Sequence, residues 1–230
     1  MDQDWKLKLA IDSTQNSGSI ALANEERVIY SAYFDIKITH SETLMPAIDY
    51  AFKFCNILRS ELQEIYVCIG PGSFTGLRIG LATAKGIAFA LGIPLYAYSS
   101  LELAALPASG LGKNIFAAVD AKMQEVYYAY YDQQLKEIIP PSIATPEELC
   151  NLDLEDFILC GSASEMLALR FKNSYNFYTL HPVMKIPSAA GLFSIPNLLP
   201  EKHIPQILEE LEPLYLREAR AQVKKAKPKQ

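Results

Sequence analysis

The stretch Gly70-Pro-Gly-Ser-Phe-Thr-Gly-Leu-Arg-Ile-Gly80 joins a short apolar segment to the most apolar helical pattern in the chain. The preceding residues, 65–69, are rich in β-formers, as expected of a strand that is covered on both faces. The two glycines beside the proline allow a sharp reversal, because glycine tolerates positive φ and proline fixes its own φ. The stretch therefore predicts a strand, a tight turn and a helix that ends near Leu91, before a glycine and a proline.

A glycine-rich turn that leads into a helix can bind an anion, because unpaired N–H groups and the helix dipole both favour negative charge there. The candidate contacts are Gly72, Ser73 and Thr75. The turn is not a P-loop, since Gly76 is followed by leucine and arginine rather than by lysine and serine or threonine. A tight turn that binds nothing explains the stretch equally well, so a phosphate site stays one of two alternatives.

The helix after the turn carries small residues at spacing i, i+4, which let another helix approach unusually closely. A second apolar helix is predicted over residues 42–58, after Thr39-His-Ser-Glu42, which has the pattern of a capping box. Both helices carry more apolar surface than one sheet can cover, and such a surplus indicates a partner site. We expect the interface to comprise Met45, Ile48, Phe52, Gly76, Gly80, Ala84 and Ala88.

The order of strand and helix patterns predicts an α/β protein with two lobes of mixed sheets flanked by helices. The first strand ends at Asp12 and two antiparallel strands follow it. Residues 107–112 are rich in glycine, proline and small side chains, so we expect one lobe over residues 1–106 and another over 107–230. A last helix is predicted over residues 204–212 and is a candidate to pack back on the first lobe.

Half of the 230 residues are hydrophobic and 20% are charged, which is typical of a folded globular protein. The sequence shows no signal-peptide pattern and no apolar run of about 20 residues, so we expect a cytoplasmic protein without a membrane span. Four isolated cysteines and three distant histidines give no local metal motif.

The formal net charge of −5 argues against broad nucleic-acid binding through bulk electrostatics. The end of the chain is an exception, because six basic residues from Arg217 onward face a single Glu218. This basic tail could contact RNA, and a solvated, frayed terminus is the alternative interpretation.

Five stretches together resemble a known family. They are the run GPGSFTGLRIGLATAKGIAFALGIPL from Gly70, Leu9-Ala-Ile-Asp-Ser-Thr14, His40-Ser-Glu42, Val119-Asp-Ala-Lys-Met-Gln-Glu-Val126 and Pro213-Leu-Tyr-Leu-Arg217. This set resembles the bacterial TsaB proteins, whose older name is YeaZ. The resemblance implies the actin-like ATPase and sugar-kinase (ASKHA) fold. It also implies a non-catalytic subunit that binds TsaD and, with TsaE, supports threonylcarbamoyl transfer to adenosine 37 of tRNAs that read ANN codons.

The resemblance further implies a homodimer when TsaD is absent and no cofactor on this chain, with ATP or ADP and a metal on the partner subunits. An actin-like ATPase or phosphotransferase is the alternative, with Asp12 and the glycine turn on the nucleotide. Asp12 could equally cap its own turn, and the chain reads Asp-Ser-Thr where the family usually reads Asp-Thr-Ser. A metallopeptidase would need metal ligands where Ser100 and Ala104 stand, and alanine has no donor atom.

Overall fold

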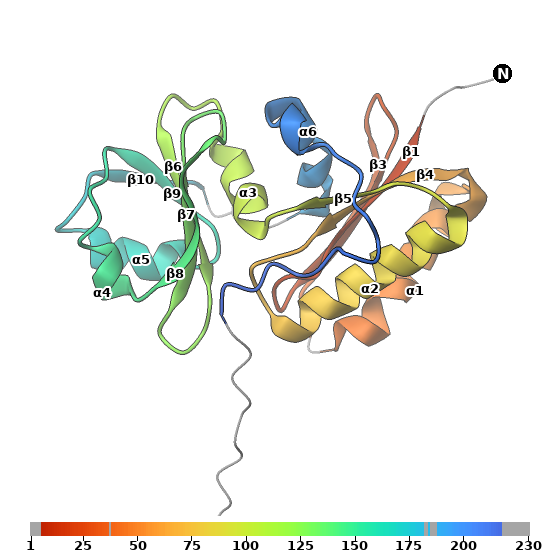
Figure 1. Cartoon of the computed structure of the whole chain (residues 1–230), viewed down its shortest axis with the longest axis horizontal. Coiled ribbons are helices and arrows are strands. Elements are labelled where there is room, and N and C mark those ends of the chain that lie inside the picture. The colour runs from red at the N-terminus through yellow and green to blue at the C-terminus, as the bar shows by residue number, and fades with distance from the viewer. Residues whose placement is uncertain (1–5, 37, 182–183, 185–187, 218–230) are drawn as a thin grey trace, which may run out of the picture.

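The computed structural model describes residues 6–36, 38–181, 184 and 188–217, and it contains two five-stranded mixed sheets (Figure 1). The first sheet has the order β3-β2-β1-β4-β5 and the second has the order β10-β9-β6-β7-β8. In the first sheet β1 pairs antiparallel with β2 and parallel with β4, and in the second β6 pairs in the same way with β7 and β9. The two sheets therefore repeat one topology, as the prediction of a duplicated two-lobed core requires.

The strands of the first sheet are β1 (Leu7–Asp12), β2 (Gly18–Ala23), β3 (Val28–Phe34), β4 (Leu62–Cys68) and β5 (Leu95–Tyr98). Those of the second sheet are β6 (Asn114–Asp120), β7 (Val126–Tyr131), β8 (Glu137–Ala144), β9 (Phe157–Cys160) and β10 (Phe177–Thr179). Strand β8 escaped prediction because Pro140 and Pro141 interrupt its pattern. It lies at a sheet edge, and the two prolines fall where its register with β7 shifts, outside the paired residues.

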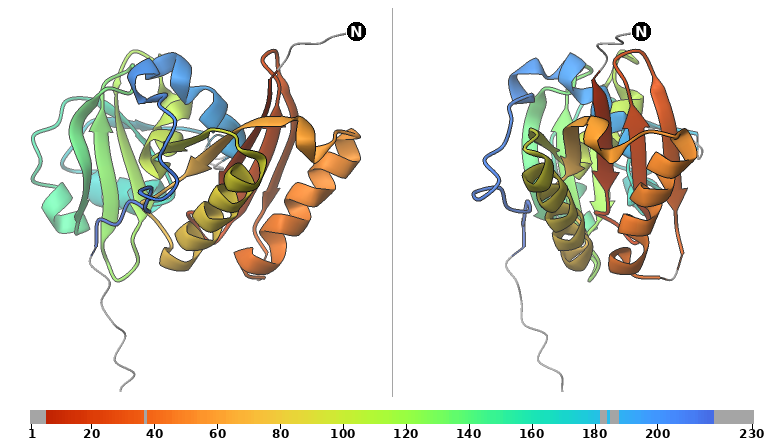
Figure 2. Two further views of the ribbon diagram at one scale, coloured as in Figure 1. Left: turned by 45° about the vertical axis from the view of Figure 1, so that its right-hand side comes forward. Right: turned by 90° about the vertical axis from the view of Figure 1, so that its right-hand side faces the viewer.

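Two long helices cover one face of the first sheet, namely α1 (His40–Cys55) and α2 (Phe74–Leu91) (Figures 1 and 2). Among the described residues, α2 is the only helix long and apolar enough to cross a membrane, and its inner side chains Leu81, Ala84 and Ala88 belong to the core of this lobe. The capping box predicted for α1 is wrong, because the Thr39 hydroxyl donates to Glu42 Oε2 at 3.1 Å and forms no cap bond.

The remaining helical elements are short. Between the lobes lie α3 (Ser100–Ala105), η2 (Leu106–Ala108), η4 (Ala189–Phe193), α6 (Ile195–Leu198) and η5 (Pro200–Lys202). The second lobe contains α4 (Pro146–Leu149) and α5 (Ser164–Phe171). In the first lobe η1 (Arg59–Glu61) precedes β4. Leu101 of α3 and Leu192 of η4 pack in one apolar cluster with Tyr66 of the first sheet and Tyr131 of the second. One continuous core therefore joins the two lobes (Figure 1).

Residues 203–217, which we call the C-terminal strap, return along the first lobe without forming the helix predicted over 204–212. The backbone of Gln206 donates to Leu95 O at 2.8 Å, and that of Leu214 donates to Ile69 O at 2.8 Å. The periodic apolar pattern misled the prediction because a segment of this length between two prolines has little helical stability of its own, and bonds to the sheet replace the helical ones. The segment does pack back on the first lobe, since Leu211 joins the α1–α2 core.

Candidate functional site

Asp12 ends β1 and is 3% exposed, so it cannot reach solvent. Its Oδ1 accepts a hydrogen bond from Thr14 N at 2.9 Å and another from Thr14 Oγ1 at 2.7 Å. Burial raises the pKa of the carboxyl group, and the bonds from Thr14 only partly oppose this effect. Within the described residues, Asp12 therefore acts as the cap of the β1–β2 turn.

The glycine turn before α2 packs directly on this β1–β2 turn. Ser73 N donates to Thr14 O at 2.7 Å, and an ideal Cβ on Gly72 would lie 2.0 Å from the same oxygen. The Ser73 hydroxyl accepts from Gly76 N at 3.3 Å, so it caps α2 as predicted. Three of the four candidate phosphate contacts, Asp12, Gly72 and Ser73, thus meet around Thr14, while Thr75 is exposed on α2.

The small-residue stripe faces the interior of its own lobe, which corrects the predicted interface. An ideal Cβ would lie 2.1 Å from Ser13 O at Gly76 and 2.1 Å from Ser13 Oγ at Gly80. Ala84 and Ala88 are 0% and 1% exposed. The stripe lets α2 approach the β1–β2 turn and the sheet, so another chain cannot reach it.

The three larger residues predicted for the interface divide between the two sides of α1. Ile48 and Phe52 are each 3% exposed and belong to the same core as the stripe, so they too are corrected. Met45 is 50% exposed and stays on the surface. Of the seven residues predicted for the interface, only Met45 therefore lies on the surface.

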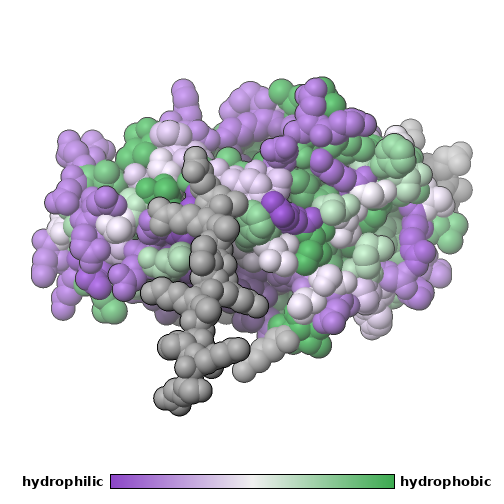
Figure 3. Space-filling view, turned by 60° about the horizontal axis from the view of Figure 1, so that its bottom comes forward, coloured by the Kyte–Doolittle hydropathy of each residue, from purple (hydrophilic) through white to green (hydrophobic). Residues whose placement is uncertain are grey.

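Four large apolar side chains on α1 and α2 are half or more exposed, and we call them the α1–α2 surface: Met45, Tyr50, Phe54 and Phe89. The rings of Tyr50 and Phe54 stack with centroids 5.7 Å apart. Figure 3 shows that hydrophobic and polar side chains mix over this part of the first lobe, at the right of the view. Sequence reasoning missed Phe89, although its place four positions after Lys85 puts it on the polar side of the helix.

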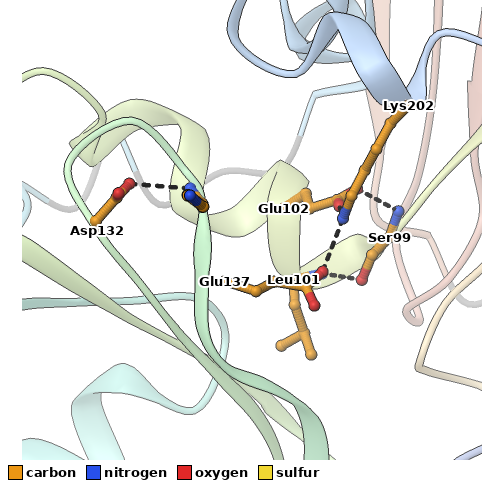
Figure 4. Close-up of polar contacts among 7 residues, drawn as sticks. Ser99, Leu101, Glu102, Asp132, Glu137 and Lys202 are labelled. Carbon is orange, nitrogen blue, oxygen red and sulfur yellow. Dashed lines mark hydrogen bonds and ion pairs between the residues drawn. The ribbon is translucent and has the colours of Figure 1, made fainter.

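A partly buried polar contact between the lobes centres on Lys202 of η5 (Figure 4). Its ammonium pairs with Glu102 of α3 and, at 2.7 Å, with Glu137 of β8. Burial lowers the pKa of Lys202, but the two carboxylates raise it more, so the net shift is upward. Glu102 also accepts from Ser99 N at 2.9 Å, which completes a capping box on α3, so the same carboxylate caps α3 and ties it to η5.

The described part of the chain contains no group of three or more histidine, cysteine or carboxylate side chains arranged to hold a metal ion. The Ser100 hydroxyl donates to Pro71 O at 2.5 Å and is 4% exposed. Ala104 packs against the inter-lobe core. Ser100 therefore holds the glycine turn, and Ala104 contributes to the inter-lobe core.

Comparisons with known proteins match the chain to proteins whose names refer to tRNA modification. The family model for TsaD, tRNA N6-adenosine threonylcarbamoyltransferase, matches residues 35–224. The chain is 37% identical to the tRNA threonylcarbamoyladenosine biosynthesis protein TsaB of Bacillus subtilis, over 57% of this chain and 59% of that protein. It is 30% identical to TsaB of Haemophilus influenzae, over 62% of this chain and 66% of that protein, so less than two thirds of each relative is spanned.

An uncharacterised protein of Mycobacterium tuberculosis is 32% identical over 77% of this chain and 75% of its own length. A solved structure titled YeaZ from Pseudomonas aeruginosa superposes with a TM-score of 0.73 at 29% identity and covers 92% of this chain and 100% of that chain. A second, titled as similar to peptidase YeaZ from the same organism, gives 0.76 at 26% identity over the same shares. With its duplicated mixed sheets, the chain has the predicted two-lobed actin-like fold and belongs to the TsaB (YeaZ) family.

Proposed function

We propose that this chain is a non-catalytic subunit that binds TsaD and, together with TsaE, supports threonylcarbamoyl transfer to adenosine 37 of tRNAs that read ANN codons. The observation that carries the proposal is the α1–α2 surface. Its four residues are aromatic or methionine, the types enriched where protein interfaces bury their central contacts. Scattered apolar residues need no explanation, but four large ones on two adjacent helices support a docking site.

The inner sides of α1 and α2 are already covered by their own sheet, which leaves only the outer sides for a partner. A stable interface buries about 1,200–2,000 Å² in total, which a pair of helices from each side can supply. We infer that the equivalent helices of TsaD cover this surface and that a second copy of this chain covers it when TsaD is absent. The assembly belongs in the cytoplasm, where tRNA is modified.

The arrangement around Asp12 supports a non-catalytic role. An actin-like ATPase or phosphotransferase needs room for phosphate beside its glycine turn, whereas Thr14 O already accepts from Ser73 N at 2.7 Å there. Oδ1 of the Asp12 carboxylate likewise already accepts two hydrogen bonds from Thr14. In this proposal the chain needs no cofactor of its own, and ATP or ADP and the metal reside on the partner subunits.

The decisive experiment compares two equally exposed apolar residues. Phe89 on α2 is 78% exposed and Leu169 on α5 of the second lobe is 81% exposed, so aspartate should leave folding intact at either site. We expect Phe89→Asp to weaken TsaD binding by about 30-fold or more, because a central interface residue typically contributes about 2 kcal/mol or more. Leu169→Asp should bind within about twofold of the parent. Isothermal titration with TsaD measures both, and circular dichroism checks the fold.

Equal affinities for the two variants would show that the α1–α2 surface is not the docking site. The non-catalytic assignment has its own test, a titration of the isolated chain with ATP and magnesium. Saturable binding accompanied by turnover would make the chain an ATPase.

A further inference from the structure

Phe74, Arg78 and Tyr215 form an exposed platform where the C-terminal strap meets the start of α2. The Arg78 guanidinium carbon lies 3.8 Å from the centroid of the Phe74 ring, and Arg78 Nε donates to Tyr215 Oη at 2.9 Å. The two rings lie 5.2 Å apart and are 43% and 39% exposed. Two segments that are distant in the sequence thus place two partly exposed aromatic rings around one cation.

The platform is held in place from both sides. On the strap, Leu214 N donates to Ile69 O at 2.8 Å, directly before Tyr215, and Arg217 pairs with Glu125 of the β6–β7 turn. On the helix, Phe74 follows the Ser73 cap. These bonds fix the backbone on each side of the rings. The protein therefore loses little additional conformational freedom when a ligand stacks on them.

The charge of Arg78 is not neutralised by any described residue, since its contacts are the two aromatic rings. The neighbouring cations differ, because Lys122 pairs with Asp120 and Arg217 pairs with Glu125. The sequence then continues past Arg217 with five lysines and arginines and one glutamate. Arg78 therefore offers a positive charge, not paired with any described carboxylate, at the end of α2 whose dipole also favours anions.

We propose that this platform binds a single-stranded segment of the tRNA substrate, with a base stacked on Phe74 or Tyr215 and a backbone phosphate on Arg78. The choice of tRNA as the ligand rests on the proposed function. Proteins bind unpaired bases by stacking them on aromatic rings and guanidinium planes, and cations add phosphate contacts. Within α2, the platform lies at the end opposite Phe89, since Phe74 and Phe89 lie about 22 Å apart at the 1.5 Å rise per residue of a helix.

The test measures dissociation constants for an unmodified tRNA transcript that carries adenosine at position 37. Fluorescence anisotropy is recorded over a series of salt concentrations, for the chain alone and for its complex with TsaD. Phe74→Ala should weaken binding by about 5- to 150-fold, the usual effect of removing one stacked base contact. Arg78→Ala should lower the slope of log K against log salt by about one, the value of one phosphate contact.

Lys85→Ala is the matched control, because it removes the same charge from the same helix about two turns beyond Arg78. It should leave affinity within about twofold and the salt slope unchanged. In the full chain, replacing Lys224, Lys225, Lys227 and Lys229 by glutamine should lower the slope by a further amount of up to about three.

Three outcomes would overturn the proposal. Phe74→Ala and Arg78→Ala could match Lys85→Ala with both the free chain and the complex. The tail variant alone could remove all binding while the platform variants keep it. The platform variants could lose TsaD and retain RNA, which would assign the platform to the protein interface. A chain that supports no modification with TsaD and TsaE contradicts the proposed function instead, whatever the RNA affinities are.

Discussion

The two lobes share one strand order but carry helices of very different length. In the first lobe α1 and α2 contain 16 and 18 residues, whereas α4 and α5 of the second lobe contain 4 and 8. The short helices suffice to close a core over the second sheet, with Leu149 and Leu167 fully buried. The extra turns of α1 and α2 are therefore not needed to cover a sheet of five strands, and they provide the apolar surface that we assign to a partner.

The turns after the first strand of each sheet also differ between the lobes, in how deeply their aspartate is buried. Asp12 and Asp120 each end the first strand of a sheet, and each accepts from the backbone N–H two residues later, at 2.9 Å and 2.8 Å. Asp12 is buried beneath the glycine turn, while the Asp120 side chain is 39% exposed and pairs with Lys122. The same local motif is thus buried against a neighbouring turn in the first lobe, whereas in the second lobe it is a partly exposed turn with an ion pair.

The largest predicted effect comes from disrupting the contact between the glycine turn and the β1–β2 turn. Gly72→Ala would place a Cβ 2.0 Å from Thr14 O, so the two turns of the first lobe must separate. We expect a loss of about 3 kcal/mol in the free energy of unfolding, the upper part of the usual range for overpacking. Gly86→Ala is the control, because no atom lies within 4 Å of its Cβ, and removing a helical glycine should stabilise by about 0.5–1 kcal/mol. Urea unfolding measures both free energies. A change of the same sign in both variants would show that the close contact at Gly72 does not matter for stability.

The next effect compares the two aspartates directly. Asp12→Ala leaves the buried N–H and O–H of Thr14 without their acceptor, which should cost about 1–3 kcal/mol of unfolding free energy. Asp120→Ala removes a half-exposed pair and should cost less than about 1 kcal/mol. TsaD binding and tRNA modification should persist in Asp12→Ala at a temperature where it is folded. Complete loss of modification by a folded, assembled Asp12→Ala protein would identify Asp12 as a nucleotide contact.

The smallest effect is a difference in pH dependence between the lobes. Burial raises the pKa of Asp12, so its contribution to stability is full below the ordinary value of about 3.9 and is lost as pH rises through the raised pKa. For Asp120 burial acts upward, but the bonds from Lys122 outweigh it and lower the pKa, so its contribution is full above about 3.9 and is lost as pH falls through the lowered pKa.

Unfolding of the parent, Asp12→Asn and Asp120→Asn between pH 3 and pH 7 measures this difference. Relative to the parent, Asp12→Asn should gain stability as pH rises, whereas Asp120→Asn should lose stability over the same interval. A shift in the same direction for both variants would show that the two turns are electrostatically alike.

Local sequence patterns determined most of the strands, the tight turn and both ends of α2. Ser73 accepts from Gly76 N and Gly92 adopts φ 64° at the helix end, and both roles follow from residue type alone. The Thr145 capping box of α4 follows from residue type in the same way. These features were predictable because the groups that satisfy them lie within three or four residues of one another.

Only the tertiary structure decided which side of α2 faces the sheet and what course the strap takes. A helix that is apolar nearly all round has the same periodicity whichever side is buried, and the choice depends on Ser13, which the fold brings beneath Gly76 and Gly80. The strap has a helical pattern but bonds to Leu95 and Ile69 of the sheet. The platform of Phe74, Arg78 and Tyr215 likewise joins segments 137 positions apart, a proximity that local residue preferences cannot encode.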